Sequence, residues 1–169
     1  MCKLCAGETL TNVSHGNDVC IFKITDISEK KRIMQICDQA FPNPVLERPN
    51  FDALFAKLDH YAEFLAVFMQ QTAIGYICFY ANDQEGRTAY ISLLAVDPIY
   101  QGMRAGSALL RACIRHAAEG GMQCIRLEVN QNNKKAIAFY ERHGFVKEND
   151  TGSDSYYMIC TLTGPVDNQ

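Results

Sequence analysis

Residues 96–107 read VDPIYQGMRAGS, and this stretch decides the fold because it turns an extended strand into a helix through a glycine-bearing turn. Upstream, AYISLLAV (residues 89–96) is apolar and rich in β-formers, and Pro98 biases Asp97 towards an extended conformation, so we expect the strand to end there. Downstream, small and apolar residues recur at helical spacing: Ala105, Leu109, Ala112, Cys113 and Ala117. The free backbone N–H groups at the start of this helix, near residues 101–107, and the positive end of its dipole suit a phosphate.

The glycine spacing disfavours two common classes of phosphate site. No Lys-Ser/Thr follows the glycines, as a nucleotide-triphosphate loop requires, and there is no GxGxxG of a dinucleotide-binding fold. What remains is the pattern Gln/Arg-x-x-Gly-x-Gly/Ala, represented here by QGMRAG at residues 101–106.

With Leu94, Val96 and Pro98 before it and SALL after it, this pattern resembles the acetyl-CoA-binding motif of the GNAT superfamily of acyl-CoA-dependent N-acetyltransferases. A second match lies in LEVNQNNKKAIAFYERHGF, residues 127–145. It carries the family's strand, its helix start, its Phe-Tyr pair and its closing Gly-Phe, which are here Asn133, Ala136, Phe139, Tyr140, Gly144 and Phe145. The resemblance covers residues 19–163. One position departs from the motif, because Arg104 stands where the middle glycine is usual.

Composition agrees with one enzyme-sized domain. The chain has 169 residues, 48% of them hydrophobic, which is enough for a core. A net charge of -3 and a pI near 5.8 argue against nucleic acid as the main partner. No apolar run is long enough to span a bilayer and MCKLCAGETL lacks a signal peptide's apolar region, so we expect a cytoplasmic protein with no membrane partner. We expect residues 1–18 to form a flexible tail and residues 19–163 the GNAT domain.

The order of elements predicts an α/β (α+β) fold. Strands are expected at VCIFKIT (19–25), AEFLAVFMQ (62–70), TAIGYICFY (72–80), TAYISLLAV (88–96), MQCIRLEVN (122–130), FVKEN (145–149) and SYYMICTL (155–162). Helices are expected after a cap at Ser28, near residues 52–58, after the glycine turn as far as Glu119, and from a cap at Asn133 to Gly144. The resemblance implies the GNAT fold: a single mixed, mostly antiparallel sheet, helices on both faces, and a splayed parallel pair at residues 88–96 and 122–130.

Acyl transfer first needs the two reactants held in alignment, which can contribute roughly 7 to 11 kcal/mol. The resemblance implies acetyl-CoA as co-substrate and assigns pantetheine binding to the main chain of Leu94 and Val96, whose side chains we expect in the core. One N–H there would face the thioester oxygen. The positions implied for cofactor binding are Leu94, Val96, Gln101, Gly102, Met103, Arg104, Ala105, Gly106, Ser107, Asn133 and Tyr140.

The departing thiolate needs a proton, and the resemblance places Tyr140 at the family's tyrosine position. A phenol of ordinary pKa about 10 can donate to a thiolate whose conjugate acid has a pKa of about 8.5. The alternative is a tyrosine that only packs its ring in the core.

The attacking amine must be neutral, and Glu128 is our candidate for its base. It alternates with Leu127 and Val129 and so points away from the face that they pack. A solvated or salt-bridged strand glutamate beside Arg126 is equally compatible with the sequence. Tyr90, Ser92 and Glu63 are alternative members of the same group.

Arg104 should keep a negative φ, because a left-handed conformation costs a non-glycine residue about 1 to 2 kcal/mol. Its guanidinium could reach the pyrophosphate or the ribose phosphate. An exposed arginine in the first helical turn is the alternative.

The eight cysteines do not suggest a disulfide framework, because six of them sit singly in apolar segments: Cys20, Cys37, Cys78, Cys113, Cys124 and Cys160. Cys2 and Cys5 form one CxxC with no second pair, so we expect no metal site.

The sequence predicts an N-acetyltransferase that transfers the acetyl group of acetyl-CoA to a primary amine of a small molecule. Protein N-termini or lysines are an alternative acceptor, and a non-catalytic acyl-CoA-binding regulatory module on the same fold is an alternative function. The proline-rich loop FPNPVLERPN (41–50) carries Arg48, which would suit an acceptor with a carboxylate or phosphate. An ordinary surface arginine is the alternative. A homodimer through the late strands is compatible with the resemblance.

Overall fold

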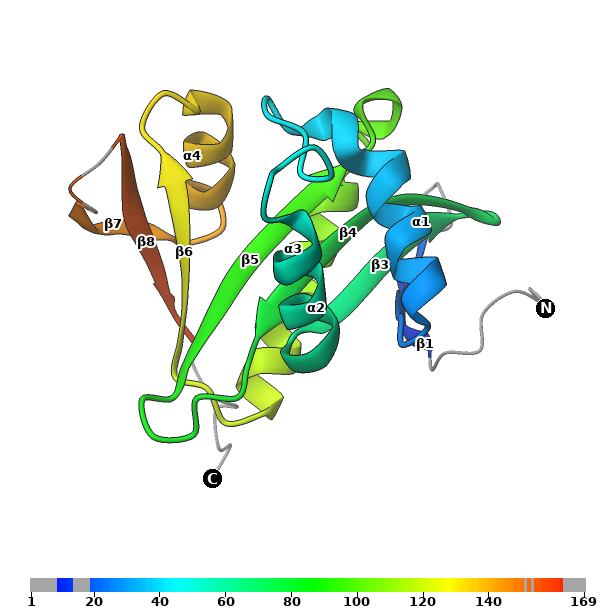
Figure 1. Cartoon of the computed structure of the whole chain (residues 1–169). Helices are drawn as coiled ribbons and strands as arrows, with labels where there is room; N and C mark the ends of the chain where they lie inside the picture. Colours follow the sequence, from blue (N-terminus) through cyan, green and yellow to red (C-terminus); the bar gives the residue numbers. More distant parts are fainter. Residues whose placement is uncertain (1–8, 14–18, 151, 153, 163–169) are drawn as a thin grey trace. The chain divides into compact units, whose positions relative to one another are not determined.

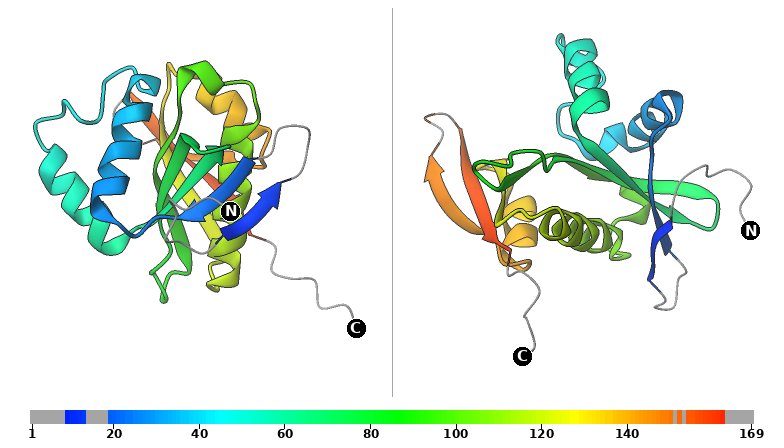
Figure 2. Two further views of the ribbon diagram at one scale, coloured as in Figure 1. Left: turned by 90° about the vertical axis from the view of Figure 1, so that its right-hand side faces the viewer. Right: turned by 90° about the horizontal axis from the view of Figure 1, so that it is seen from below.

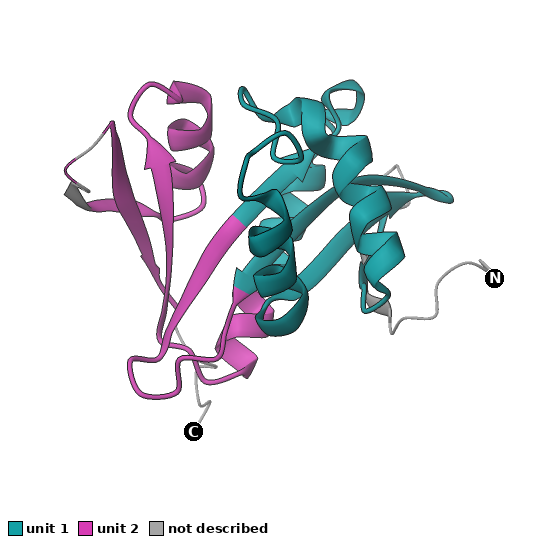
Figure 3. Cartoon of the chain, viewed as in Figure 1, with its two compact units in different colours: residues 1–79, 93–113 teal, residues 80–92, 114–169 magenta. Residues whose placement is uncertain are grey.

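The computed structural model describes residues 9–13, 19–150, 152 and 154–162 (Figure 1). The chain divides into two compact units (Figure 3). Unit 1 comprises residues 1–79 and 93–113, and unit 2 comprises residues 80–92 and 114–169. The chain passes between them three times: between Phe79 and Tyr80, within strand β5 (Thr88–Val96) and within helix α3 (Ala105–Glu119). Both units are therefore discontinuous in sequence.

Eight strands in the described part of the chain form a sheet with the hydrogen-bonded order β1-β2-β3-β4-β5-β6-β8-β7. Besides β5 these are β1 (Thr9–Val13), β2 (Val19–Lys23), β3 (Glu63–Met69), β4 (Thr72–Tyr80), β6 (Cys124–Asn130), β7 (Val146–Asp150) and β8 (Ser155–Thr161). Strands β5 and β6 are parallel over Thr88 to Ile91, whereas β1–β2, β2–β3, β3–β4, β6–β8 and β7–β8 are antiparallel. The mixed, mostly antiparallel sheet confirms the predicted fold class.

Two details of the sequence prediction have a different outcome. The predicted tail contains β1, which pairs with β2, so part of it is a strand that the sequence analysis did not identify. The remaining tail residues, Cys2 and Cys5 among them, lie outside the described residues, and the domain boundary at residue 18 stays a prediction. The splaying of β5 from β6 involves residues of both units and also stays a prediction.

In unit 1, helices cover both faces of the strands (Figure 2). Helices α1 (Ile27–Cys37) and α2 (Phe51–Tyr61) lie on one face, and the first part of α3 lies on the other. The interior of β3 is buried on both faces, as its unbroken apolar sequence FLAVF requires. Buried Lys30 of α1 contacts Asp59 of α2, with 2.7 Å between Nζ and Oδ1, and this ion pair joins the two helices.

The cap of α1 corrects the prediction of Ser28. The side chain of Asp26 accepts a 2.8 Å hydrogen bond from the N–H of Glu29, so Asp26 is the N-cap. A carboxylate at this position also interacts favourably with the helix dipole. The sequence SxxK starting at Ser28 lacks the acidic partner of a capping box, whereas Asp26 stands three residues before Glu29.

Strands β4 and β5 approach closely at Gly75. A Cβ at this position would lie 2.8 Å from the carbonyl oxygen of Ala95 and 3.2 Å from the side chains of Val67 and Val96. No real Cβ tolerates the first distance, so glycine is required here by space rather than by conformation.

In unit 2, β6 alternates strictly between two faces. Ile125, Leu127 and Val129 are buried, whereas Arg126 and Glu128 on the other face are half-buried and exposed. Helix α4 (Lys134–Glu141) follows, preceded by Asn133, whose side chain accepts a 3.1 Å hydrogen bond from the N–H of Ala136. This confirms the predicted cap. Gly144 has a left-handed φ of 86°, and the N–H of Phe145 donates to Tyr140 O as the chain leaves the helix.

The six cysteines among the described residues are all free thiols. Cys37, Cys78 and Cys113 are buried, and burial raises the pKa of the Cys37 thiol to about 12. They serve as small hydrophobic side chains. None of the helices in the described ranges has the length and apolar character needed to cross a membrane.

Candidate functional site

The end of β5 is fixed by hydrogen bonds within unit 1. The N–H of Asp97 donates to Ile74 O at 2.9 Å, and the Asp97 side chain accepts the N–H of Ile99 at 3.0 Å. A short 3-10 turn, Pro98–Tyr100, follows. The strand therefore ends at the position that Pro98 predicts.

The side chain of Gln101 is used by the turn itself. Its Nε2 donates to the carbonyl oxygen of Val96 at 3.2 Å, which closes the segment between the strand and the helix. Val96 is 9% exposed, as expected for a side chain that packs in the core. Leu94 is only half-buried, because β5 alternates and buries Leu93 and Ala95 on the other face, so the expectation is not met there. The first glutamine of the motif thus orients the loop that follows.

Gly102 and Arg104 both adopt left-handed conformations, with φ of 87° and 62°. The expectation of a negative φ at Arg104 is wrong. The chain needs two left-handed residues to turn from the 3-10 segment into α3, and the second of them carries a side chain at a cost of about 1 to 2 kcal/mol. Around Gly102, an added Cβ would meet no atom within 4 Å, so the outside of the turn is open.

The turn leads directly into the N-terminus of α3. The first helical hydrogen bond runs from the N–H of Ala108 to Arg104 O at 3.0 Å, so the N–H groups of Ala105, Gly106 and Ser107 precede the regular helical pattern. Met103 and Arg104 are exposed, whereas Ala105 is buried and anchors the helix. Successive N–H groups, an exposed guanidinium and the helix dipole make this segment of unit 1 suitable for a phosphate. We call residues 101–107 the phosphate turn.

Unit 2 holds the remaining predicted site residues. Tyr140 on α4 is half-buried, and its ring contacts Phe139 and Phe145 with centroids 5.2 and 5.5 Å away. These contacts fix the ring's orientation. Asn133 begins the same helix, so one short element carries both Asn133 and Tyr140.

Glu128 lies on the polar face of β6. Opposite it on β8 is Tyr157, and the hydroxyl of Ser155 donates a short hydrogen bond to Glu128 Oε1. Neither Ser155 nor Tyr157 was identified from the sequence, because they lie 27 and 29 residues from Glu128 and meet it only through the strand pairing. The sequence of β8 contains Ser155 and Tyr157, but it does not specify how β8 is aligned with β6.

Tyr90 of β5 belongs to the same polar face, opposite Arg126. Burial, together with the negative charge of Glu128, raises the pKa of the Tyr90 phenol to about 12. Arg126 lies over the ring of Tyr157, with 5.0 Å between Cζ and the ring centroid, and its Nη2 is 2.5 Å from Glu148 Oε2 on β7. Unit 2 therefore brings the predicted Tyr90 and Glu128 to one face.

The other two alternatives, Glu63 and Ser92, belong to different units. Glu63, at the start of β3 in unit 1, forms an ion pair with Lys23, with Nζ and Oε2 2.6 Å apart. Ser92 is half-buried and lies two residues from Tyr90 on β5 in unit 2, so it shares the face of Tyr90.

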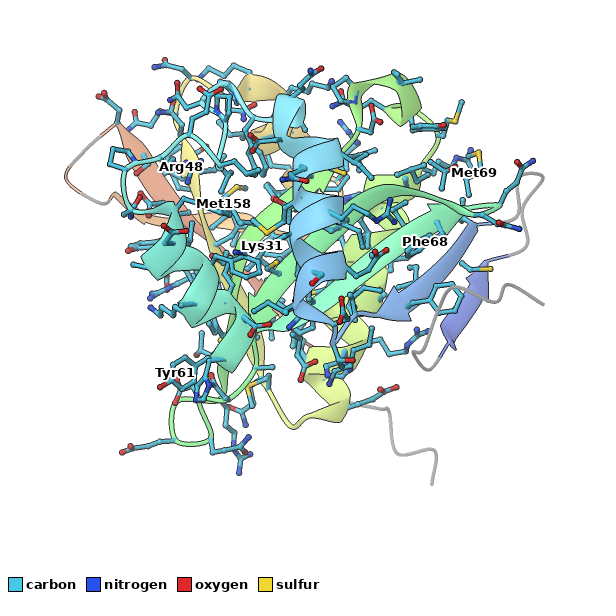
Figure 4. All side chains as sticks on the ribbon, turned by 45° about the vertical axis from the view of Figure 1, so that its right-hand side comes forward. Lys31, Arg48, Tyr61, Phe68, Met69 and Met158 are labelled. Carbon is cyan, nitrogen blue, oxygen red and sulfur yellow. The ribbon has the colours of Figure 1, made fainter. Side chains whose placement is uncertain are left out.

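The loop over residues 41–50 is held by the carboxylate of Asp38. Its Oδ1 accepts the N–H groups of Val45 and Leu46 at 2.7 and 3.3 Å. Figure 4 shows Arg48 in this loop near the start of α2 and Tyr61 at the other end of the helix. Arg48 Nη2 approaches Asn43 O at 3.5 Å, so the arginine is partly used within the loop.

Three curated relatives are named as acetyltransferases. The mycothiol acetyltransferase of Propionibacterium freudenreichii subsp. shermanii is 37% identical over 48% of this chain and 27% of its own length. The spermine/spermidine N(1)-acetyltransferase of Bacillus subtilis is 30% identical over 53% of this chain and 63% of its own length. The N-alpha-acetyltransferase MAK3 of Arabidopsis thaliana is 28% identical over 68% of this chain and 60% of its own length. The chain thus spans less than two thirds of each of these relatives.

Solved structures have the same fold. Ard1 from Thermoplasma volcanium is 26% identical with a TM-score of 0.70, and the match covers 86% of this chain and 98% of that one. The PaiA N-acetyltransferase of Thermoplasma acidophilum, solved in complex with coenzyme A, has a TM-score of 0.66 at 18% identity over 85% of this chain and 98% of that one.

The family model described as "Acetyltransferase (GNAT) family" matches residues 30–145, which is more than half of the chain and includes the phosphate turn and Tyr140. The chain belongs to the GNAT family of acetyltransferases.

Proposed function

We propose that this protein is an acetyl-CoA-dependent N-acetyltransferase that acetylates a primary amine of a small molecule. The observation that carries the proposal is the phosphate turn, in which Gly102, Arg104 and the first N–H groups of α3 form an open, positively polarised segment directly after β5. Membership of the GNAT family supports the acetyl-CoA assignment.

In unit 1, the N–H groups of Ala105, Gly106 and Ser107 bind the pyrophosphate in this proposal. Gln101, Gly102 and Met103 shape the turn, and Arg104 adds a charge-assisted contact to a phosphate. The main chain of Leu94 and Val96 binds pantetheine. An N–H group that meets the developing oxyanion is typically worth about 100- to 1000-fold in rate.

In unit 2, Tyr140 acts as the general acid and Glu128 as the general base. Bound acetyl-CoA supplies the thioester, and Tyr140 donates its phenolic proton to the departing sulfur. Glu128 accepts the proton of the attacking amine, directly or through one water. Its hydrogen bond from Ser155 holds one carboxylate oxygen, which leaves the other for this proton. Asn133 fixes the start of the helix that carries Tyr140.

A protein N-terminus is the second candidate acceptor. The similarity to the Arabidopsis N-alpha-acetyltransferase covers a larger share of this chain than those to the other two relatives described above. A regulatory module without catalysis is less well supported, because the turn keeps its left-handed conformation at Arg104 and the chain has a tyrosine, Tyr140, at the family's tyrosine position.

The release of free CoA from acetyl-CoA tests the proposal. The full chain should release CoA in the presence of some members of a panel of small primary amines, and more slowly with peptides that carry a free N-terminus. CoA release with peptides alone would replace the small-molecule acceptor by the protein N-terminus. Tight binding of acetyl-CoA without transfer to any acceptor would favour the regulatory module.

A further inference from the structure

The polar face of β5, β6 and β8 in unit 2 carries aromatic rings and a carboxylate side by side. Residues opposite one another in neighbouring strands share a face, and so do residues two apart in one strand. Tyr90 is opposite Arg126, and Glu128 is opposite Tyr157. Arg126 and Glu128 are two residues apart on β6, so Tyr90, Arg126, Glu128 and Tyr157 all lie on one face of the strands.

Arg126 is already neutralised on this face. Its Nη2 lies 2.5 Å from Oε2 of Glu148 in an ion pair, and the side chains of Arg126 and Glu148 are only 36% and 24% exposed. The same guanidinium lies over one side of the Tyr157 ring, which keeps that ring in place. Arg126 and Glu148 therefore act as a support for Tyr157.

Glu128 is different from Glu148. It is exposed, its described contact is the neutral hydroxyl of Ser155, and no ion pair to it is found in the described part of the chain. A hydrogen bond from a hydroxyl orients a carboxylate but leaves its charge in place. The face thus has one negative charge available to a ligand.

A carboxylate beside tyrosine rings suits an organic cation. Ring faces attract ammonium groups, most strongly when water is partly excluded, and a carboxylate adds a hydrogen-bonding counter-charge. Ile159, opposite Arg126 on β8, adds a half-buried apolar side chain to the same face. We propose that Tyr90, Glu128 and Tyr157 bind an acceptor that carries a single ammonium group attached to an apolar substituent. We call these three residues the ammonium seat; Ser155 positions its carboxylate.

The seat rests on the proposed function, because it names the acceptor class of that reaction. It takes the amine in its charged form, and Glu128 then accepts the proton before transfer. A polyamine gains nothing from its further ammonium groups, since Glu148, the other carboxylate on this face that the structure describes, is paired with Arg126.

Benzyltrimethylammonium is a suitable probe because it carries the charge and the ring but cannot be acetylated. Its binding to the full chain is measured by calorimetry, with and without saturating CoA, beside neutral benzyl alcohol. Benzyltrimethylammonium should bind at least several-fold more tightly than benzyl alcohol. Tyr157→Leu should weaken its binding about 2- to 30-fold, the range of cation–π interactions. Glu128→Gln should weaken the binding of the cation by up to about 5-fold and leave the affinity for benzyl alcohol unchanged.

The matched control is Tyr156→Leu. Tyr156 is the neighbouring residue of β8 and points to the opposite face, where Lys147 lies over its ring at 4.5 Å. Its replacement should leave the affinity for the cation within about 2-fold. Equal binding of the cation and the alcohol, or equal losses in the two leucine variants, would overturn the seat.

A transfer assay separates the seat from the proposed function. Benzylamine should be acetylated with a kcat/KM at least equal to that of spermine, and a preference for spermine of 10-fold or more would contradict a single-cation seat. Binding of the quaternary cation without acetylation of any amine leaves the seat intact and contradicts the proposed function. Acetylation of amines with no binding of the quaternary cation supports the proposed function and contradicts the ammonium seat.

Discussion

Gly102 and Arg104 are two residues apart and share a left-handed backbone, one with no side chain and the other with a long cationic one. Glycine adopts this conformation freely, whereas an arginine is strained in it. Strain of this kind is typical of functional sites, where surrounding structure maintains it. The exposed side chain of Arg104 makes the site more positive than the glycine of the usual motif would.

Arg104→Gly should therefore stabilise the fold and weaken CoA binding at once. Relief of the left-handed strain should raise the free energy of unfolding by about 0.5 to 1 kcal/mol after the entropic cost of glycine is subtracted. Urea denaturation and CoA titration measure the two effects. Met103→Gly is the control, since Met103 is exposed without a positive φ, and it should lower stability. A loss of stability in Arg104→Gly would contradict the strain.

Gly106→Glu should lower CoA affinity by at least about 10-fold, because it puts a carboxylate beside the N–H groups that we assign to the pyrophosphate. Gly106→Gln has nearly the same size without the charge, so it isolates the electrostatic part. The melting temperatures of both variants should be similar. If the glutamate and glutamine variants bind CoA equally well, the pyrophosphate does not lie at this turn.

Tyr140→Phe should reduce kcat by about 100- to 10,000-fold while CoA affinity stays within a few-fold. The phenylalanine keeps the ring contacts with Phe139 and Phe145, so stability should hardly change. The transfer rate at saturating acetyl-CoA checks this, with CoA binding measured separately. Normal turnover with chemistry as the slow step would assign the proton to water or to another residue.

Tyr90 should make the fold sensitive to alkali. Burial, with the charge of Glu128, raises the pKa of its phenol to about 12 in the folded chain, against about 10 in the unfolded one. Between these values the unfolded chain binds fewer protons, so the contribution of Tyr90 to stability is complete below pH 10 and is lost as pH rises towards 12. The free energy of unfolding of the Tyr90→Phe variant should fall less steeply between pH 10 and 12 than that of the unmodified protein. Parallel curves for the two proteins would contradict the raised pKa.

Gly75→Ala should destabilise the protein by about 1 to 3 kcal/mol, the usual range for overpacking. The added methyl would meet Ala95 O at 2.8 Å, and backbone cannot move aside as a side chain can. Chemical denaturation measures the loss. Gly120→Ala is a suitable comparison, because its nearest contacts would be an ordinary 3.4 Å, and it should change stability by less than 1 kcal/mol.

Local signals in the sequence predicted what local physics determines. Pro98 marked the end of β5, Asn133 marked the start of α4, and alternation along β6 placed Glu128 on the polar face. The φ of Arg104 was missed, because the intrinsic preference of arginine is overridden by the turn that its neighbours make. The contact of Ser155 with Glu128 was missed for another reason. It depends on the register of β6 with β8, which no local pattern specifies.

The hydrogen bond from Ser155 to Glu128 also has a consequence for the order in which the chain is synthesised. A ribosome makes residue 128 well before residue 155, so a growing chain carries Glu128 for 27 residues before its partner exists. The elements of unit 1 are complete at residue 113, whereas unit 2 waits for β8. A nascent chain released before residue 155 would contain the whole phosphate turn but lack the hydroxyl group that orients Glu128.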